Sequence, residues 1–523
     1  MAPARRTRIT LWILLAIFVA GVLGIVYLLT VPPPFESWIE GRVQVALREH
    51  YGSNVRLQNL HATLIPIFTV SADNFVLPNR GGGELPPLIT VKHIEVEAAP
   101  FELLRSPVHL SRVVLTGLEI RVPPKGERST QAPGLPPGAR PVSKSKEHTR
   151  LANFVIDRVQ ADGTELYVLR KDPRREPLNF ELRKLSLRGA GPGQPMTFTS
   201  ELTNPTPPGL IETKGSFGPW NFDQPSSTRV SGHYTFQHAD LSVFNGISGI
   251  LSSAGDYQGV LHNIVVDGAT DTPDFKLDSG GKAVHLTTQF HAIVDGTNGN
   301  TYLQPVKAHF LKSDVVTTGA VSSKPGEKGK TVALDVDIEQ ARVQDVLALA
   351  SKSEPAVLTG GLSVKASVVV PPGKERVLRK MTVNGRFDVA DARFNDEKLR
   401  HAVAELSKRG QGKPDADITD VPADFAGDFY LAQENLSFRQ LQFVVPGAVA
   451  QVKGSYAIPS ETIDFEGDVK MNATLSQMMG GKHWWLVPFD PLFMKHGAGT
   501  YLPFKITGTR SHPDVNVDWK KLF

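Results

Sequence analysis

The feature that most constrains the fold is a repeated alternation of apolar and polar residues. After Gly52 many apolar side chains recur at every second position, as in a β-strand with one apolar and one solvated face. Residues 284–294, 332–339 and 463–475 show the pattern most clearly. Their apolar positions are the candidate binding residues: Val284, Leu286, Phe290, Val332, Leu334, Val336, Ile338, Ile463, Phe465, Val469 and Met471.

Helical patterns are too few to cover the apolar faces of so many strands. They occur at residues 240–251, 341–351, 395–409 and 490–495. Parallel sheets carry helices on both faces, so the expected sheet is largely antiparallel. Its apolar face must pack on a second sheet, curl into a barrel or groove, or hold an apolar ligand. The pattern alone leaves these three alternatives open.

The N-terminal region contains a run without a charged residue, residues 9–31, which is long enough for a helix to cross a bilayer. Arg5, Arg6 and Arg8 precede it, so the positive-inside rule predicts a cytoplasmic tail at residues 1–8. The alternative is a cleaved secretory signal, whose apolar region is shorter and ends at small residues. Both interpretations export the main body of the chain.

The rest of the chain divides by composition. Residues 35–51 have the apolar spacing of an amphipathic helix, and short strand patterns follow at 55–57, 68–70, 75–77, 89–91, 94–96, 113–115 and 118–122. These define an N-terminal region, 35–122. Residues 123–150 are polar and rich in proline and glycine, which predicts a flexible loop or linker. Residues 151–523 form an elongated β-rich region.

Composition and motifs exclude several classes of chemistry. The chain has no cysteine, so it has no disulfide, thiolate metal site or cysteine nucleophile. A net charge of +4 over 523 residues, without a basic run between aromatics, argues against a nucleic-acid partner. His285 and His291 are too far apart on one strand to share a metal, and Asp335 and Asp337 lie on a solvated face. We therefore predict no catalytic residue, metal or cofactor, and no enzyme.

Two further features concern aromatic residues. The segment 483–489 is apolar and aromatic, and burial at the end of a sheet is favoured over an exposed contact with a membrane or partner. A Gly-x-aromatic tripeptide recurs, and an aromatic can cover the bare backbone of a strand glycine. It begins at Gly215, Gly232, Gly385, Gly427 and Gly454.

The order of these segments resembles AsmA-like proteins of the bacterial envelope, the wider group that includes the TamB and YhdP types. The resemblance begins with the apolar run and the helix at 35–51, and it continues through residues 54–57, 70–77, 94–104 and 110–122. It ends with patterns at 427–429, 441–443, 446–447, 453–456, 501–509 and 512–514. It covers nearly the whole chain and rests on the order of its segments.

The resemblance implies a curled, taco-like antiparallel β-sheet with an apolar inner groove, similar to chorein-type bridge-like lipid transfer proteins. It implies a single-pass bacterial inner-membrane protein with most of its chain in the periplasm, which supports phospholipid transport toward the outer membrane. Phospholipids and the inner membrane are the expected partners, with outer-membrane or other envelope proteins in addition. Two alternatives remain: an assembly or scaffold factor for outer-membrane proteins, and a carbohydrate-active enzyme on a β-rich scaffold.

Overall fold

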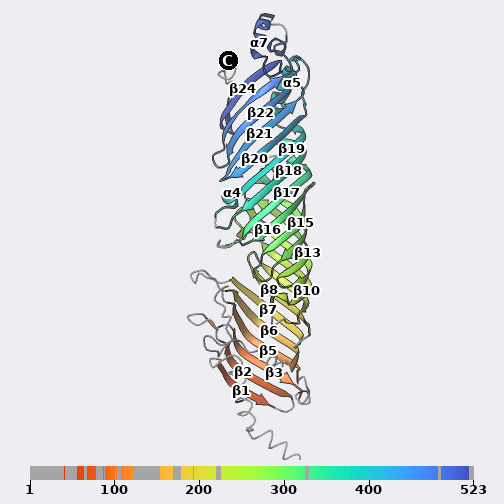
Figure 1. Cartoon of the computed structure of the whole chain (residues 1–523), viewed down its shortest axis with the longest axis vertical. Helices are drawn as coiled ribbons and strands as arrows, with labels where there is room; N and C mark the ends of the chain where they lie inside the picture. Colours follow the sequence, from red (N-terminus) through yellow and green to blue (C-terminus); the bar gives the residue numbers. More distant parts are fainter. Residues whose placement is uncertain are drawn as a thin grey trace, which may run out of the picture. The chain divides into compact units, whose positions relative to one another are not determined.

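The computed structural model is dominated by β-strands (Figure 1). It describes residues 41, 56–63, 67–77, 86–87, 89–99, 102, 108–122, 154–168, 178–191, 194–219, 225–278, 280–323, 329–352, 354–373, 375–480 and 484–517. The predicted membrane span at 9–31 and the predicted linker at 123–150 lie outside these residues. So does the predicted helix at 35–51, except for Gly41, which is helical. Within the described part of the chain, no helix is both long and apolar enough to cross a bilayer.

The chain divides into two compact units. Unit 1 comprises Met1–Pro205 and Leu210–Gly232, and unit 2 comprises Thr206–Gly209 and His233–Phe523. The described strands belong to one open 25-stranded sheet, so the prediction of a mainly β fold is confirmed.

Strands β1 to β10 pair mostly with their neighbours in sequence. Their bounds are β1 Arg56–Thr63, β2 Phe68–Leu77, β3 Ile89–Ala98, β4 Val108–Leu110, β5 Arg112–Val122, β6 Phe154–Val168, β7 Leu178–Ala190, β8 Met196–Pro205, β9 Pro208–Phe217 and β10 Arg229–Asp240.

The sheet is mostly antiparallel, as predicted, but unit 1 contains two parallel pairings. Strands β4 and β5 both pair with β6 in parallel, with Val113 opposite Val159 and Val122 opposite Val168. Parallel neighbours need a crossover connection rather than a tight turn. The sheet is therefore mixed, although most of its pairs are antiparallel.

The later strands form an uninterrupted antiparallel series from β12 to β25. Their bounds, with the short β11, are β11 Ile247–Ser248, β12 Ile250–Val260, β13 Asn263–Leu277, β14 Val284–Val294, β15 Thr301–Phe310, β16 Ser313–Ser322, β17 Thr331–Arg342, β18 Leu358–Val370, β19 Thr382–Phe394, β20 Ala423–Ala432, β21 Asn435–Val445, β22 Ala448–Ala457, β23 Thr462–Met471, β24 Thr500–Thr509 and β25 His512–Val517.

The described helices are short and lie between strands. They are η2 Pro225–Ser227, η3 Leu241–Val243, α3 Val343–Ala350, α4 Val377–Lys380, α5 Glu397–Gly410, α6 Leu475–Met478, η4 Trp484–Phe489 and α7 Asp490–Phe493. The predicted helices at 341–351 and 395–409 are confirmed as α3 and α5, with adjusted ends, and the short turn predicted at 490–495 forms α7.

The helix predicted at 240–251 is wrong. Asp240 does cap a helical turn, because its side chain accepts a hydrogen bond from the Ser242 backbone N–H, but only η3 forms. Gly246 and Gly249 adopt positive φ angles of 117° and 133°, which end the helical path and lead into β11 and β12.

The largest buried core lies in unit 2, where helices pack against the strands. Ala404 of α5 and Met478 of α6 join Ala392, Ala423 and Met471 of the strands in this core. Figure 1 places α5 and α7 at the same end of unit 2 as β24. The core holds the sheet and its short helices together by apolar burial, at roughly 25 cal/mol per Å².

Candidate functional site

The strand register joins the three predicted runs into one continuous apolar face. Residues directly opposite each other on neighbouring strands point to the same side of a sheet. One row of such residues, here called the central row, crosses unit 2 from β12 to β25 and contains Phe290, Val336 and Phe465. In order, it is Gly255, Gly268, Phe290, Val306, Thr317, Val336, Ala366, Gly385, Phe429, Phe438, Gly454, Phe465, Ile506 and Val515.

Parallel rows on the same side extend this surface, which we call the apolar face. One contains Leu334, Val368, Val383, Leu431, Leu436, Tyr456 and Ile463. Another contains Val389, Phe425, Phe443, Ala450, Val469 and Leu502. The face therefore presents aliphatic and aromatic side chains over many adjacent strands.

The recurring Gly-x-aromatic tripeptide has a packing role on this face. Gly385 lies opposite Phe429, and Gly427 lies opposite Phe387, so each phenylalanine stands beside the glycine of the neighbouring strand. The ring centroids of Phe387 and Phe429 are 6.1 Å apart, and Phe438 lies 6.0 Å from Phe465. The glycines make room for a connected series of aromatic rings, as the tripeptide predicts.

All eleven predicted residues lie on the apolar sides of their strands, and none is fully exposed. Val284, Ile338 and Met471 are buried, with exposures of 4%, 9% and 6%, and the last two belong to the helix-covered core. The half-buried members are Leu286, Phe290, Val332, Leu334, Val336, Ile463, Phe465 and Val469. These eight side chains retain surface that an apolar ligand can contact.

Among the described residues, helices cover the apolar face near the strand ends that lead to them. Helix α5 begins after Asp396, whose carboxylate accepts a hydrogen bond of 3.0 Å from the Leu399 backbone N–H. Its Val403 and Leu406 pack on the core that contains Val389 and Met471. The row through Leu334 and Ile463 contributes no residue to that core, although its Val383 is buried. Helices thus cover the apolar face at one end of these strands and not along their full length.

The opposite side of the same strands carries cross-strand ion pairs. Lys365 Nζ lies 3.2 Å from Asp337 Oδ2, and Lys453 Nζ lies 2.9 Å from Glu466 Oε1. These side chains are exposed to solvent, so each pair adds at most about 1 kcal/mol to stability. The ion pairs therefore identify this side of the sheet as the solvated face, opposite the apolar face.

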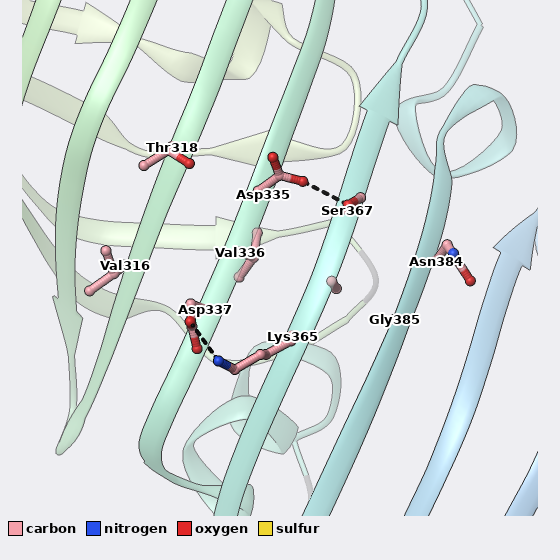
Figure 2. A pocket seen from close by; sticks show the side chains of 10 residues that line it. Val316, Thr318, Asp335, Val336, Asp337, Lys365, Ser367, Asn384 and Gly385 are labelled. Carbon is pink, nitrogen blue, oxygen red and sulfur yellow. Dashed lines mark hydrogen bonds and ion pairs between the residues drawn. The ribbon is translucent and has the colours of Figure 1, made fainter.

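A shallow depression of about 550 Å³ lies on this polar side (Figure 2). Asp335 and Asp337 project into it. Asp335 Oδ1 accepts a 2.7 Å hydrogen bond from the Ser367 hydroxyl, while Asp337 pairs with Lys365. Thr318 and Asn384 line it from β16 and β19. Each carboxylate thus contacts β18 through one oxygen, and Asp337 Oδ1 is buried without a hydrogen-bond partner among the described residues.

The histidines of the β13–β14 pair also face this polar side, each beside its own carboxylate. His291 Nδ1 is 2.7 Å from Asp267 Oδ1, and His285 Nε2 is 2.5 Å from Asp271 Oδ1. They do not come together, which agrees with their separation in sequence. Among the described residues, no group of three or more histidine and acidic side chains could hold a metal ion.

Sequence reasoning missed most members of the apolar face. The alternation of apolar and polar residues could have predicted them, because each belongs to a strand with that pattern. They lie mainly on β18 to β22 and β24 and include Val364, Val368, Val383, Phe387, Phe425, Phe429, Phe438, Leu441, Phe443, Val452, Phe504 and Ile506.

Comparison with family models, with curated proteins and with solved structures found no match to this chain.

Proposed function

We propose that this protein shields phospholipid acyl chains along its apolar face and supports phospholipid movement from the bacterial inner membrane toward the outer membrane. In this proposal residues 9–31 anchor the chain in the inner membrane, and the sheet lies in the periplasm. The protein acts as a binding surface and carries out no reaction.

The observation that carries the proposal is the continuity of the apolar face. The central row runs through neighbouring strands from β12 to β25 with hydrophobic, glycine, alanine or threonine residues and no charged residue. Eight of the predicted residues on this face keep exposed surface. Connected apolar surface of this extent, where it lies in water, normally serves for binding.

The energetics favour an acyl chain over a compact polar ligand. Moving one CH₂ group from water to an apolar surface contributes about 0.8 kcal/mol, so a lipid tail gains from each step along the face. A row without charges has no fixed partner for a headgroup, which can stay in water. A lining of similar side chains also lets a tail shift between neighbouring positions.

Charge placed on the apolar face tests the proposal. Leu334→Asp and Phe465→Asp put a carboxylate at half-buried positions of the face, so both should reduce the rate of phospholipid transfer at least tenfold. The assay follows a fluorescent phospholipid from vesicles that hold the full chain to acceptor vesicles. Circular dichroism and thermal unfolding should show a retained β-sheet.

The matched control is Ala333→Asp, which adds the same charge to β17 one residue away. Ala333 is exposed and lies on the polar side with Asp335, so transfer should stay near the wild-type rate. Equal transfer by all three variants would contradict the proposal. Unfolding of Leu334→Asp and Phe465→Asp would instead indicate a closed core.

A second candidate function, assembly of outer-membrane proteins, is favoured by the last strand of the described sheet. Strand β25 pairs with β24 on one side, no described strand pairs with its other edge, and all its residues are exposed. Such an edge can add an incoming β-segment. Capture of unfolded outer-membrane barrel proteins by the full chain would support this function, and a lipid-binding surface alone should not enrich them.

A further inference from the structure

The C-terminal part of unit 2 carries a second apolar surface, separate from the apolar face. The segment between β23 and β24 holds α6, η4 and α7, and we call its described residues 474–480 and 484–499 the cap. Five large apolar side chains of the cap are exposed: Met479 by 43%, Trp485 by 54%, Val487 by 54%, Leu492 by 46% and Met494 by 51%. The expected burial of the 483–489 segment therefore does not hold for Trp485 and Val487.

Internal hydrogen bonds hold this exposed arrangement in place. The Ser476 backbone N–H donates to Asp490 Oδ1 at 2.8 Å, and the Ser476 hydroxyl donates to Asp490 Oδ2 at 2.6 Å. Asp490 itself is buried, with 8% exposure. These bonds tie the start of α7 to α6, so the apolar side chains project from a fixed base.

The charges of the cap complement an anionic surface. The described residues of the cap contain one lysine, Lys495, and one acid, Asp490. The single carboxylate points into the cap, where Ser476 engages it. A neighbouring carboxylate, that of Asp415, lies beside Gly480, next to the C-terminal end of α6. The η4–α7 part of the cap thus combines apolar residues with no outward acid of its own.

From these observations we infer that the cap inserts its apolar side chains into the surface of a phospholipid bilayer. Tryptophan prefers the interface between water and acyl chains, and exposed aliphatic side chains next to basic residues are typical of segments that lie on membranes. Lysines near such a surface are attracted to anionic headgroups. This inference does not rest on lipid binding by the apolar face, because the two surfaces share no residue.

A single fluorescent label tests the inference in the full chain. Since the protein has no cysteine, Val487→Cys provides one site for an environment-sensitive dye. The labelled chain is held in a lipid nanodisc and mixed with vesicles of phosphatidylcholine and phosphatidylglycerol. We expect these vesicles to shift the dye emission to shorter wavelength. The shift should be larger than the shift caused by vesicles of phosphatidylcholine alone.

The matched control is Ser460→Cys, in the exposed turn before β23, at the opposite end of that strand from the cap. Its emission should not change. Leu492→Glu in the Val487→Cys chain should abolish the shift while circular dichroism stays unchanged. No shift at residue 487, or equal shifts at both labels, would overturn the inference. A shift that needs no vesicles and grows with protein concentration would also overturn it, because a second copy would then cover the cap.

Discussion

At the scale of single residues, the apolar face depends on glycines as much as on hydrophobic side chains. Gly454 sits in the central row between Phe438 and Phe465. A Cβ atom there would lie 2.6 Å from Phe465 Cδ1 and 2.2 Å from the Asp464 carbonyl oxygen, and the residue has a φ of +153°. The sequence motif predicts a glycine covered by an aromatic but cannot reveal which strand supplies the ring.

Gly454→Ala should destabilise the protein by roughly 1–3 kcal/mol, because the added methyl group meets backbone that cannot move freely. Gly361→Ala is the control, since its Cβ would meet nothing closer than the Ala390 carbonyl oxygen at 3.9 Å. That variant should stay within about 0.5 kcal/mol of the wild type. Chemical unfolding of both variants measures the difference, and equal stabilities would contradict this packing role.

At the scale of elements, periodicity predicts the kind of element and the face of each residue, but not its partner. The alternation of 332–339 predicts β17, and the helical pattern at 395–409 predicts α5. The parallel pairing of β5 with β6 was not predictable, because register depends on contacts between distant parts of the chain. Predicted strands 68–70 and 75–77 merge into β2, because Asn74 takes a φ of 52° within the strand rather than in a turn.

The strand predicted at 463–475 is shorter than expected and ends at Met471. Helix α6 begins at Leu475 instead, with Thr474 and Gln477 forming a capping box. The Ser476–Asp490 contact that fixes the cap was also missed, because a serine and an aspartate fourteen residues apart give no periodic signal.

The Asp490 contact predicts a pH-dependent cap. Burial alone would raise the pKa of the Asp490 carboxyl, but the hydrogen bonds from Ser476 and Thr474 together outweigh it and place the pKa below the ordinary value of 3.8. Because the folded-state pKa is lowered, this stabilisation is present above pH 3.8 and is lost as the pH falls through the folded-state value. Acidification in that range should loosen the cap.

Asp490→Asn should loosen the cap already at neutral pH, at a cost of roughly 1–3 kcal/mol. The carboxylate accepts the two hydrogen bonds from Ser476 with two oxygens, whereas an amide has only one oxygen. Hydrogen exchange at constant pH should show faster exchange at the Ser476 and Met478 backbone amides. Asp240→Asn is the control, because Asp240 accepts a comparable bond from Ser242 outside the cap. Unchanged protection in Asp490→Asn would show that the contact does not hold the cap.

At the scale of the whole molecule, the account rests on a sheet whose two sides differ throughout unit 2. One side carries ion pairs such as Lys365–Asp337, and the other carries the central row. The sequence alone left a sandwich, a closed barrel and an open groove as alternatives. The described sheet is open, and short helices cover only part of its apolar face.

The most direct test of the central claim compares the two sides of the same strands in living cells. A photo-reactive amino acid replaces Leu334 or Phe465 on the apolar face, or the adjacent Asp335 or Asp464 on the polar side, in the full chain. After illumination, mass spectrometry measures phospholipid attached to the purified protein. The account predicts lipid adducts at residues 334 and 465 and none at 335 and 464. Absence of adducts at all four sites, or equal amounts on both sides, would contradict it.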